Sequence, residues 1–295
     1  MSRGAGAPRI AFLERRHPAG HRGAIADALI PLLRGRGADV AVVHAELGAH
    51  RLDERPPWDA VVLKSGSAAA LHVAAGAEAW GIPCVNTAEA TRLAQDRLAS
   101  AMILHREGLP VPVPRLAWLG ARAADAQPVA VGAPAAAPGC SAGPPLEGLE
   151  DRPLIVKAAR GSQGEGLWKV ASGELRRVVD GLPEGPYLVM DWVPHTGHDL
   201  KVFVAGTWMA AIERPFPAHT LEQKRGRAVA LPAAVREATA RAGRLLGLSA
   251  YGCDWVFGEG GWSLVDVNAF PGFKGADGAG VALADTIMGV ARAGG

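Results

Sequence analysis

The sequence has few cysteines and almost no net charge, and both absences exclude a class of protein. Its 295 residues include 3 cysteines, Cys84, Cys140 and Cys253. No two of them are close in sequence and their number is odd, so we expect neither a disulfide framework nor a thiolate zinc site. The 31 basic and 29 acidic side chains nearly cancel, so no bulk field favours nucleic acid or an anionic membrane.

Long apolar runs are also missing. No stretch approaches the length of a membrane span. The first sixteen residues carry charge on both sides of a very short apolar run, which is not typical of a signal peptide. We therefore expect a soluble, cytoplasmic protein with neither a membrane nor a nucleic-acid partner.

The first ninety residues alternate strand-like and helix-like patterns. Expected strands are 9–13, 39–44, 58–64 and 82–86, and expected helices are 23–33, 67–80 and 88–105. This alternation of strands and helices predicts a small parallel sheet with helices on both faces. In such sheets functional groups collect at the carboxyl ends of the strands, where residues 64–67 fall.

The rest of the chain has a different pattern. Residues 121–145 are almost wholly Ala, Gly, Pro, Val and Ser, which is typical of a flexible insertion. Expected strands follow at 153–159, 166–171, 186–193, 199–205 and 207–214, and an expected helix at 233–246.

Three oxygen-bearing side chains near the C-terminus predict a metal site. Alternation along 262–268 predicts a strand, so Asp266 and Asn268 share one face. Asp254 lies on the preceding expected strand and opposes them across a hairpin. Two carboxylates and an amide oxygen suit a hard divalent cation such as Mg²⁺. The alternative is a pair of unrelated surface acids on a hairpin.

A lysine and a glycine-rich run predict phosphate binding. Lys157 ends an expected strand, and Gly161-Ser162-Gln163-Gly164-Glu165-Gly166 follows it. Closely spaced glycines let backbone N–H groups approach phosphate oxygens, and a lysine adds charge. The spacing matches neither the P-loop nor the dinucleotide fingerprint. An ordinary turn is the alternative.

Two further segments carry polar side chains between these motifs. Asp191 and Val193 end an expected strand whose apolar residues and backbone would suit an adenine ring. Asp199 and Lys201 share one face of the next expected strand. A solvated strand face is the alternative for this pair.

Together these motifs resemble the ATP-grasp superfamily over about residues 9–280. The motifs occur in the family's order along the chain. Asn86, a helix and the Asp-basic pair ending at Arg97 come first, and Lys157 with its glycine-rich loop follows. Asp191 in the segment between two lobes, Asp199-x-Lys201, and Asp254 with Asp266-x-Asn268-x-x-Pro-Gly complete the series. RimK-like ligases are the branch it resembles most, and the inositol trisphosphate kinases share the fold. The resemblance implies a fold of class α/β and α+β, with three lobes in which two α+β lobes sandwich ATP. The lobes would be an N-terminal α/β domain over 1–95, a central lid subdomain over 96–193 with a flexible insertion at 121–150, and a C-terminal subdomain over 194–295 with the metal site.

The resemblance also implies roles for individual residues. Nucleotide binding would involve Arg97, Lys157, Gly161, Ser162, Gln163, Gly164, Gly166, Asp191, Val193 and, at the ribose, Asp199. Asp254, Asp266 and Asn268 would hold Mg²⁺, with Mn²⁺ as a substitute. Lys201 and Arg214 would steady the transferred phosphoryl group or the acyl phosphate.

The implied function is ATP-dependent joining of a carboxylate to an amine through an acyl phosphate, releasing ADP and phosphate. The substrates would be small molecules, with an amino acid or peptide among the candidates, and a homodimer is left open. Arg97 stands where the family usually has lysine, and Asp266 and Lys201 replace the usual Glu and Arg of the glutamate ligases. The departures at Asp266 and Lys201 favour the kinase branch, whereas the nearly neutral chain disfavours a polyphosphorylated substrate. Arg97 supports a nucleotide-binding module that has lost its chemistry. The two alternatives are therefore a kinase and a nucleotide-binding module that catalyses no reaction.

Overall fold

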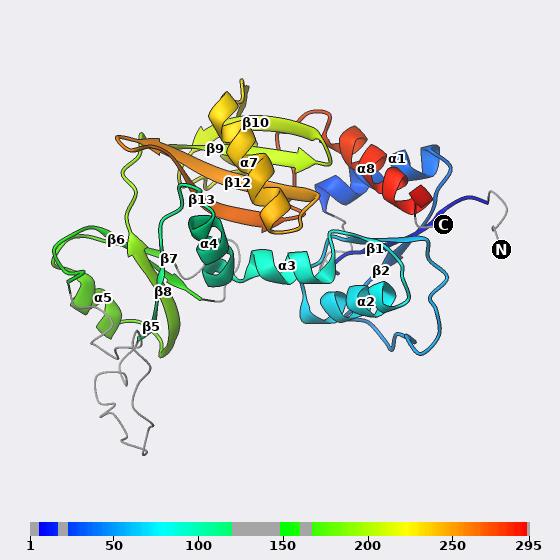
Figure 1. The fold of residues 1–295 in the computed structure, drawn as a ribbon, viewed down its shortest axis with the longest axis horizontal. Helices are drawn as coiled ribbons and strands as arrows, with labels where there is room; N and C mark the ends of the chain where they lie inside the picture. Colours follow the sequence, from blue (N-terminus) through cyan, green and yellow to red (C-terminus); the bar gives the residue numbers. More distant parts are fainter. Residues whose placement is uncertain (1–5, 17–22, 120–147, 160–166, 294–295) are drawn as a thin grey trace, which may run out of the picture. The chain divides into compact units, whose positions relative to one another are not determined.

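The computed structural model describes residues 6–16, 23–119, 148–159 and 167–293 of the chain. The chain divides into two compact units (Figure 1). Unit 1 combines residues 1–95 with 195–295, and unit 2 covers 96–194. The predicted N-terminal and C-terminal segments thus share one unit. The predicted division into three domains stays a prediction.

Unit 1 begins with the predicted parallel sheet. Its strands are β1 (Arg9–Leu13), β2 (Asp39–Val43), β3 (Ala60–Leu63) and β4 (Cys84–Val85), in the order β2-β1-β3-β4. Alternation along β1 sends Ile10 and Phe12 to the core formed with α1 (Ala24–Gly35) and α8 (Ala279–Ala293). It sends Ala11 and Leu13 to the core formed with α2 (Ala68–Ala79). Helices therefore cover both faces of the sheet, as predicted.

A five-stranded antiparallel sheet completes unit 1. It consists of β9 (His198–Ala205), β10 (Trp208–Pro215), β11 (Arg227–Val229), β12 (Ala250–Gly258) and β13 (Gly261–Ala269), in the order β11-β10-β9-β12-β13. Phe203, Ile212 and Phe270 join the same buried cluster as Ile10 and Phe12. This shared core explains why the two ends of the chain form one unit. The helices α6 (Leu221–Arg225) and α7 (Ala233–Leu245) belong to this part of the chain.

Unit 2 is a smaller α+β body. Its sheet has the order β5-β8-β6-β7, from β5 (Arg115–Leu119), β6 (Leu154–Ala158), β7 (Leu167–Val170) and β8 (Gly185–Asp191), and all three of its strand pairings are antiparallel. The helices are α4 (Arg97–Arg106) and α5 (Leu175–Asp180). The antiparallel arrangement predicted after the Ala/Pro-rich segment is confirmed.

The long helix expected over 88–105 is wrong, because the structure has two helices there. α3 (Ala88–Gln95) ends before Asp96, and α4 begins after it. Asp96 has an extended backbone and its carboxylate accepts a hydrogen bond from Ala99 N, so it is the N-cap of α4. The break coincides with the boundary between the two units.

Among the described residues, no helix has the length and apolar character required to cross a membrane.

Candidate functional site

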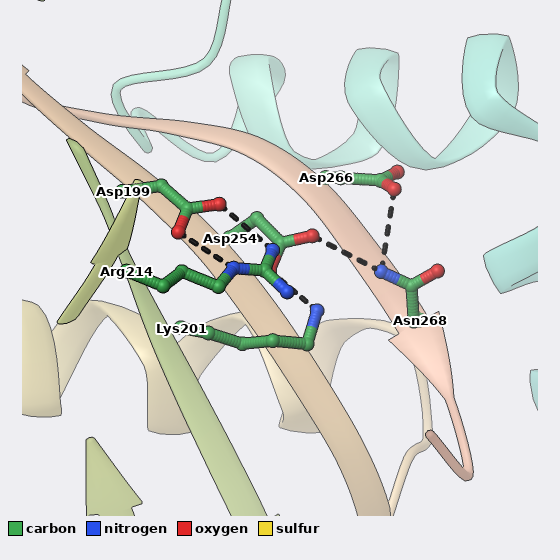
Figure 2. A network of polar contacts seen from close by, with 6 residues as sticks. All are labelled: Asp199, Lys201, Arg214, Asp254, Asp266 and Asn268. Carbon is green, nitrogen blue, oxygen red and sulfur yellow. Dashed lines mark hydrogen bonds and ion pairs between the residues drawn. The ribbon is translucent and has the colours of Figure 1, made fainter. Parts of the chain in front are cut away.

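Six polar side chains lie on one face of the five-stranded sheet of unit 1 (Figure 2). They come from four neighbouring strands and are Asp199, Lys201, Arg214, Asp254, Asp266 and Asn268. Alternation puts Lys201 on the same face as Phe203, and Phe270 comes directly after the end of β13, two residues after Asn268. The two phenylalanines belong to the buried core. One end of this sheet face thus forms the core, and the other end carries the polar cluster.

The strand register explains why the cluster forms. Lys201 lies opposite Asp254, and Asp254 lies opposite Asp266, so the three form one row across β9, β12 and β13. Asn268 is opposite Gly252 in the next row on this face. The hairpin pairing predicted from the alternation of 262–268 is therefore confirmed.

Asp254 is the centre of the cluster. Its Oδ1 accepts a hydrogen bond from Lys201 Nζ and lies 3.4 Å from Arg214 Nη2. Its Oδ2 lies 3.5 Å from Asn268 Nδ2, and the same nitrogen lies 3.2 Å from Asp266 Oδ2. Both basic groups therefore contact one oxygen of the Asp254 carboxylate, and the Asn268 amide contacts the other.

The donor set fits a divalent cation. Among the described residues, no three His, Cys, Asp or Glu side chains form a metal-binding group. A cation here would therefore take its third oxygen from the Asn268 carboxamide. That group presents its nitrogen to both carboxylates, and a rotation of 180° about its terminal torsion presents the oxygen instead. Asp199, Asp254 and Asp266 carry three negative charges against two on Lys201 and Arg214, which also favours a cation.

Asp199 and Arg214 form a buried, two-pronged ion pair. Arg214 Nε donates to Asp199 Oδ1 at 2.7 Å, and Nη2 donates to Oδ2 at 2.8 Å. The Asp199 side chain is 0% exposed. Burial raises the pKa of this carboxyl group, the hydrogen bonds from Arg214 lower it, and the charge of Asp254 raises it again; the net direction is upward.

The ribose role predicted for Asp199 stays a prediction, and the structure shows this side chain in an ion pair. Both of its oxygens are engaged by Arg214, and the carboxylate has no exposed surface to offer a hydroxyl. The side chain instead fixes the guanidinium group, and Arg214 is oriented toward Asp254 as a result. The spacing of Asp199 and Lys201 correctly predicted that the two side chains share one face of the strand. It could not show that the Asp199 carboxylate is buried.

Helix α7 supports the strand that carries Asp254 from the opposite face. Trp255 Nε1 donates to Thr239 Oγ1 at 3.0 Å, and the Tyr251 hydroxyl donates to Thr239 O at 2.9 Å. A Cβ atom at Gly243 would overlap the Tyr251 ring and hydroxyl. These contacts hold β12 firmly, so the position of Asp254 is well defined.

Unit 2 holds the residues predicted to bind the nucleotide, apart from Asp199, which lies in unit 1. Ile155 and Lys157 lie on one face of β6. Ile155, Leu188 and Met190 form a small buried cluster with Leu98 and Trp192 packed against it. The apolar members of this face were not predicted individually. The alternation around Lys157 is the signal that could have identified Ile155.

Arg97 lies beside the strand that carries Lys157. Its Nη1 donates to Ala158 O at 3.4 Å. Asp191 is at the end of β8, where its side chain is 58% exposed and pairs with Arg152 at 3.3 Å. Alternation puts this side chain on the face opposite Met190, so only its backbone remains suited to an adenine contact.

Part of the predicted nucleotide site cannot be placed. Gly161, Ser162, Gln163, Gly164 and Gly166 lie outside the described residues. Val193 is half-buried just beyond β8. The roles predicted for all of these nucleotide-binding residues stay predictions.

A cavity of about 340 Å³ lies beside Arg214 in unit 1. Its lining residues are His198, Glu213, Arg214, Pro215, Glu222, Gln223, Gly226 and Arg227. Gly226 has a φ of 57°, and a Cβ atom there would overlap Glu213 O. The cavity was not predicted, because no motif marks residues 215–231.

Known proteins resemble this sequence along most of its length. It is 27% identical over 276 residues to the ribosomal protein bS6–L-glutamate ligase of Escherichia fergusonii, covering 88% of this chain and 84% of the relative. It is 28% identical over 211 residues to a probable alpha-L-glutamate ligase of Parasynechococcus marenigrum, covering 67% of this chain but only 41% of that longer protein. No family model matches the sequence.

Solved structures share the fold. A RimK domain ATP-grasp protein from Sphaerobacter thermophilus superposes with a TM-score of 0.67 at 22% identity, covering 95% of this chain and 99% of that one. The ATP-grasp ligase PsnB, complexed with a variant of its minimal precursor, Mg and ADP, gives a TM-score of 0.64 at 17% identity, covering 99% of both chains.

These similarities confirm the predicted α/β and α+β fold of the ATP-grasp type and the resemblance to the RimK-like ligases. They also confirm the prediction of an ATP-grasp enzyme of the ligase class. The kinase and the module without chemistry gain no support from them.

Proposed function

We propose that this RimK-like ATP-grasp ligase uses ATP to activate a carboxylate and joins it to the amine of an amino acid. The observation that carries the proposal is the polar cluster of unit 1. Lys201 and Arg214 converge on Asp254, which in turn faces Asn268 and, across the strand pair, Asp266. Phosphoryl transfer needs positioning and charge neutralisation more than covalent catalysis by the protein. This cluster offers both.

Mg²⁺ is the cation we propose for Asp254, Asp266 and Asn268, and Mn²⁺ would suit the same oxygens. When bound, the cation supplies charge neutralisation at the terminal phosphates of the nucleotide. The relative PsnB was solved with Mg and ADP. The fit of the donor set, rather than that complex alone, supports the choice of these three residues.

Lys201 and Arg214 would neutralise charge on the reacting groups. In the first step a carboxylate oxygen attacks the γ-phosphorus of ATP, the bond to the bridging oxygen breaks, and ADP leaves. In the second step the amine attacks the acyl carbon, phosphate leaves and the nitrogen loses a proton. The forked Asp199 pair holds the Arg214 guanidinium in one orientation, which lowers the reorganisation needed in either step.

Nucleotide binding would use unit 2. Lys157 would contact phosphate oxygens, with Arg97 next to the same strand. The apolar cluster around Ile155 and Met190 would contact the adenine ring, with the backbone of Asp191 and Val193 at its edge. Arginine at position 97 retains the charge of the usual lysine and adds a forked donor geometry.

The substrates we propose are an amino acid as the amine and a small molecule or peptide as the carboxylate. The Escherichia fergusonii relative is a ligase that joins L-glutamate to ribosomal protein bS6, and PsnB was solved with its precursor peptide. The cavity beside Arg214 carries both acidic and basic side chains, which suits a ligand with both an ammonium and a carboxylate group. A homodimer stays a proposal without a structural argument.

Hydroxylamine tests the reaction class without knowledge of the natural amine. The protein is incubated with ATP, Mg²⁺, hydroxylamine and pooled carboxylic acids, and ADP, phosphate and hydroxamate are measured. We expect equal amounts of all three products. ADP accompanied by a new phosphoester and no free phosphate would show a kinase instead.

A further inference from the structure

Lys201 is a buried lysine whose ammonium group contacts a predicted metal ligand (Figure 2). Only 8% of the residue is exposed. Within the described part of the chain, the ammonium group makes one hydrogen bond, to Asp254 Oδ1, and it lies 5.8 Å from the centroid of the Phe203 ring. Lys201 on β9 and Asp254 on β12 are directly opposite each other in the sheet. The strand register therefore brings the two side chains together.

The same oxygen of Asp254 also faces Arg214. Arg214 Nη2 lies 3.4 Å from Asp254 Oδ1. A carboxylate oxygen has about two lone pairs, so two donors use the acceptor capacity of Oδ1. A divalent cation at Asp254 therefore competes with a basic group for these lone pairs and is repelled by its charge.

Arg214 is held in place, whereas Lys201 can move. The Asp199 carboxylate is 0% exposed and accepts from Arg214 at 2.7 and 2.8 Å. Departure of Arg214 would leave that buried charge without compensation, which is costly. Lys201 carries a compact charge with rotatable donors on a flexible stem. Lys201 is therefore the group that a cation would displace from Asp254.

The nucleotide offers Lys201 another partner. The function proposed above puts the terminal phosphates next to Asp254, Asp266 and Asn268. Phosphate oxygens accept strong, charge-assisted hydrogen bonds from an ammonium group. An ammonium group that left Asp254 without such a partner would lie buried and unpaired, at a large cost in free energy. Exchange of the Asp254 carboxylate for a phosphate avoids this cost.

We propose that Lys201 is an internal counter-ion that makes cation binding at Asp254 conditional on the nucleotide. The ammonium group neutralises Asp254 and disfavours Mg²⁺ until phosphate oxygens arrive, and it then turns to them and leaves the carboxylate to the cation. This inference rests on the proposed ligase function and adds an order of binding that the reaction itself does not require. The coupling is reciprocal, so a change at Lys201 must alter the binding of both ligands.

Mn²⁺ binding to the nucleotide-free protein tests the proposal without turnover. The EPR signal of free Mn²⁺ is recorded as protein is added. Lys201→Met leaves the carboxylates of the cluster opposed by Arg214 alone, so the Kd for Mn²⁺ should be about 10-fold or more below that of the wild type. Lys201→Arg keeps the charge and should stay within about 3-fold of the wild type. The double variant Lys201→Met/Asp266→Ala should lose the gain, because the cation would then lack a ligand.

The affinity for cation-free ATP should change in the opposite direction. In calorimetry with EDTA present, the Kd for ATP should rise about 10-fold or more in Lys201→Met, because the phosphates lose an ammonium partner. General damage to the site would weaken both ligands, whereas loss of a counter-ion strengthens one and weakens the other. Arg36→Met removes one positive charge from an exposed ion pair with Asp285. This matched control should leave both constants within about 2-fold.

Amine labelling of the wild-type protein keeps the test decisive where Lys201→Met does not fold. The protein is acetylated with and without saturating Mn²⁺, and modification of Lys201 is quantified by mass spectrometry. Mn²⁺ alone should increase the labelling rate about 5-fold or more, because it displaces the ammonium group from Asp254.

An equal or weaker affinity for Mn²⁺ in a folded Lys201→Met would overturn the counter-ion role. A gain in affinity that survives Asp266→Ala would overturn it too, as would unchanged labelling at saturating Mn²⁺. None of these measurements uses turnover, so their failure differs from failure of the ligase function, which is absence of hydroxamate. Hydroxamate formation together with unchanged Mn²⁺ binding would reject the counter-ion role alone.

Discussion

The ion pair between Asp199 and Arg214 gives the sharpest energetic prediction. Arg214→Met removes both donors of a carboxylate that is 0% exposed and bound at 2.7 and 2.8 Å. Removing one partner of a buried ion pair costs about 3–5 kcal/mol, because the other charge stays buried without compensation. Domains are stable by about 5–15 kcal/mol, so the variant should still fold.

The expected loss is large enough to measure by thermal and urea unfolding. At about 2–4 °C per kcal/mol, the Tm should fall by roughly 6–20 °C. The double variant Asp199→Asn/Arg214→Met removes both charges and should be more stable than Arg214→Met alone. This comparison separates the buried charge from the lost packing of the arginine side chain.

The same variant should depend on pH in a predictable direction. Burial and the charge of Asp254 already raise the pKa of Asp199 above its ordinary value of 3.8. Loss of Arg214 removes the hydrogen bonds that oppose this rise, so the folded state binds a proton more readily than the unfolded state. Stability then falls as the pH rises through the folded pKa. The deficit of the variant should be smaller in acid, and a deficit below about 1 kcal/mol at neutral pH would refute the reasoning.

Three further predictions concern the metal site, the nucleotide and the thiols. Asp266→Ala and Asn268→Ala should each lower Mg²⁺-dependent ATP consumption at least about 100-fold while circular dichroism shows an intact fold; retained consumption would show that the metal lies elsewhere. Lys157→Ala should raise the Kd for ATP at least about 10-fold by calorimetry, and an unchanged Kd would remove this lysine from the site. Burial raises the pKa of the Cys84 and Cys253 thiols, so both should resist iodoacetamide until the protein unfolds, and rapid alkylation of native protein would contradict this burial.

Local patterns predicted much of unit 1. The apolar runs of the first ninety residues gave the parallel strands, because buried strands of a covered sheet leave a clear signal. The alternation of Asp266 and Asn268 gave the correct face and pairing with Asp254. Side-chain period and hairpin geometry are local properties, so a single sequence contains them.

Long-range packing was not predictable in the same way. The shared core that joins Phe12 to Phe270 depends on contacts across most of the chain. The break at Asp96 was missed because the apolar positions continue across it, although Asp96 with Ala99 forms an N-cap. Helix α8 was also missed, although its residues Leu283, Ile287 and Ala291 have helical spacing.

The enclosure of Asp199 shows a further limit. Its spacing from Lys201 identified the strand face, yet the partner Arg214 comes from the adjacent strand. Whether a carboxylate binds a ligand or an arginine depends on that cross-strand neighbour. Sequence spacing alone does not contain this information.

Oxygen transfer from the carboxylate to phosphate tests the central claim most directly. A carboxylic acid that forms hydroxamate is prepared with ¹⁸O in its carboxyl group, and the phosphate released during a single turnover with L-glutamate is analysed by mass spectrometry. Formation of an acyl phosphate, followed by attack of the amine on the acyl carbon, predicts one ¹⁸O atom in each phosphate from fully labelled acid. Released phosphate that contains no ¹⁸O would show that the carboxylate never attacks ATP, and would contradict the ligase function proposed for this site.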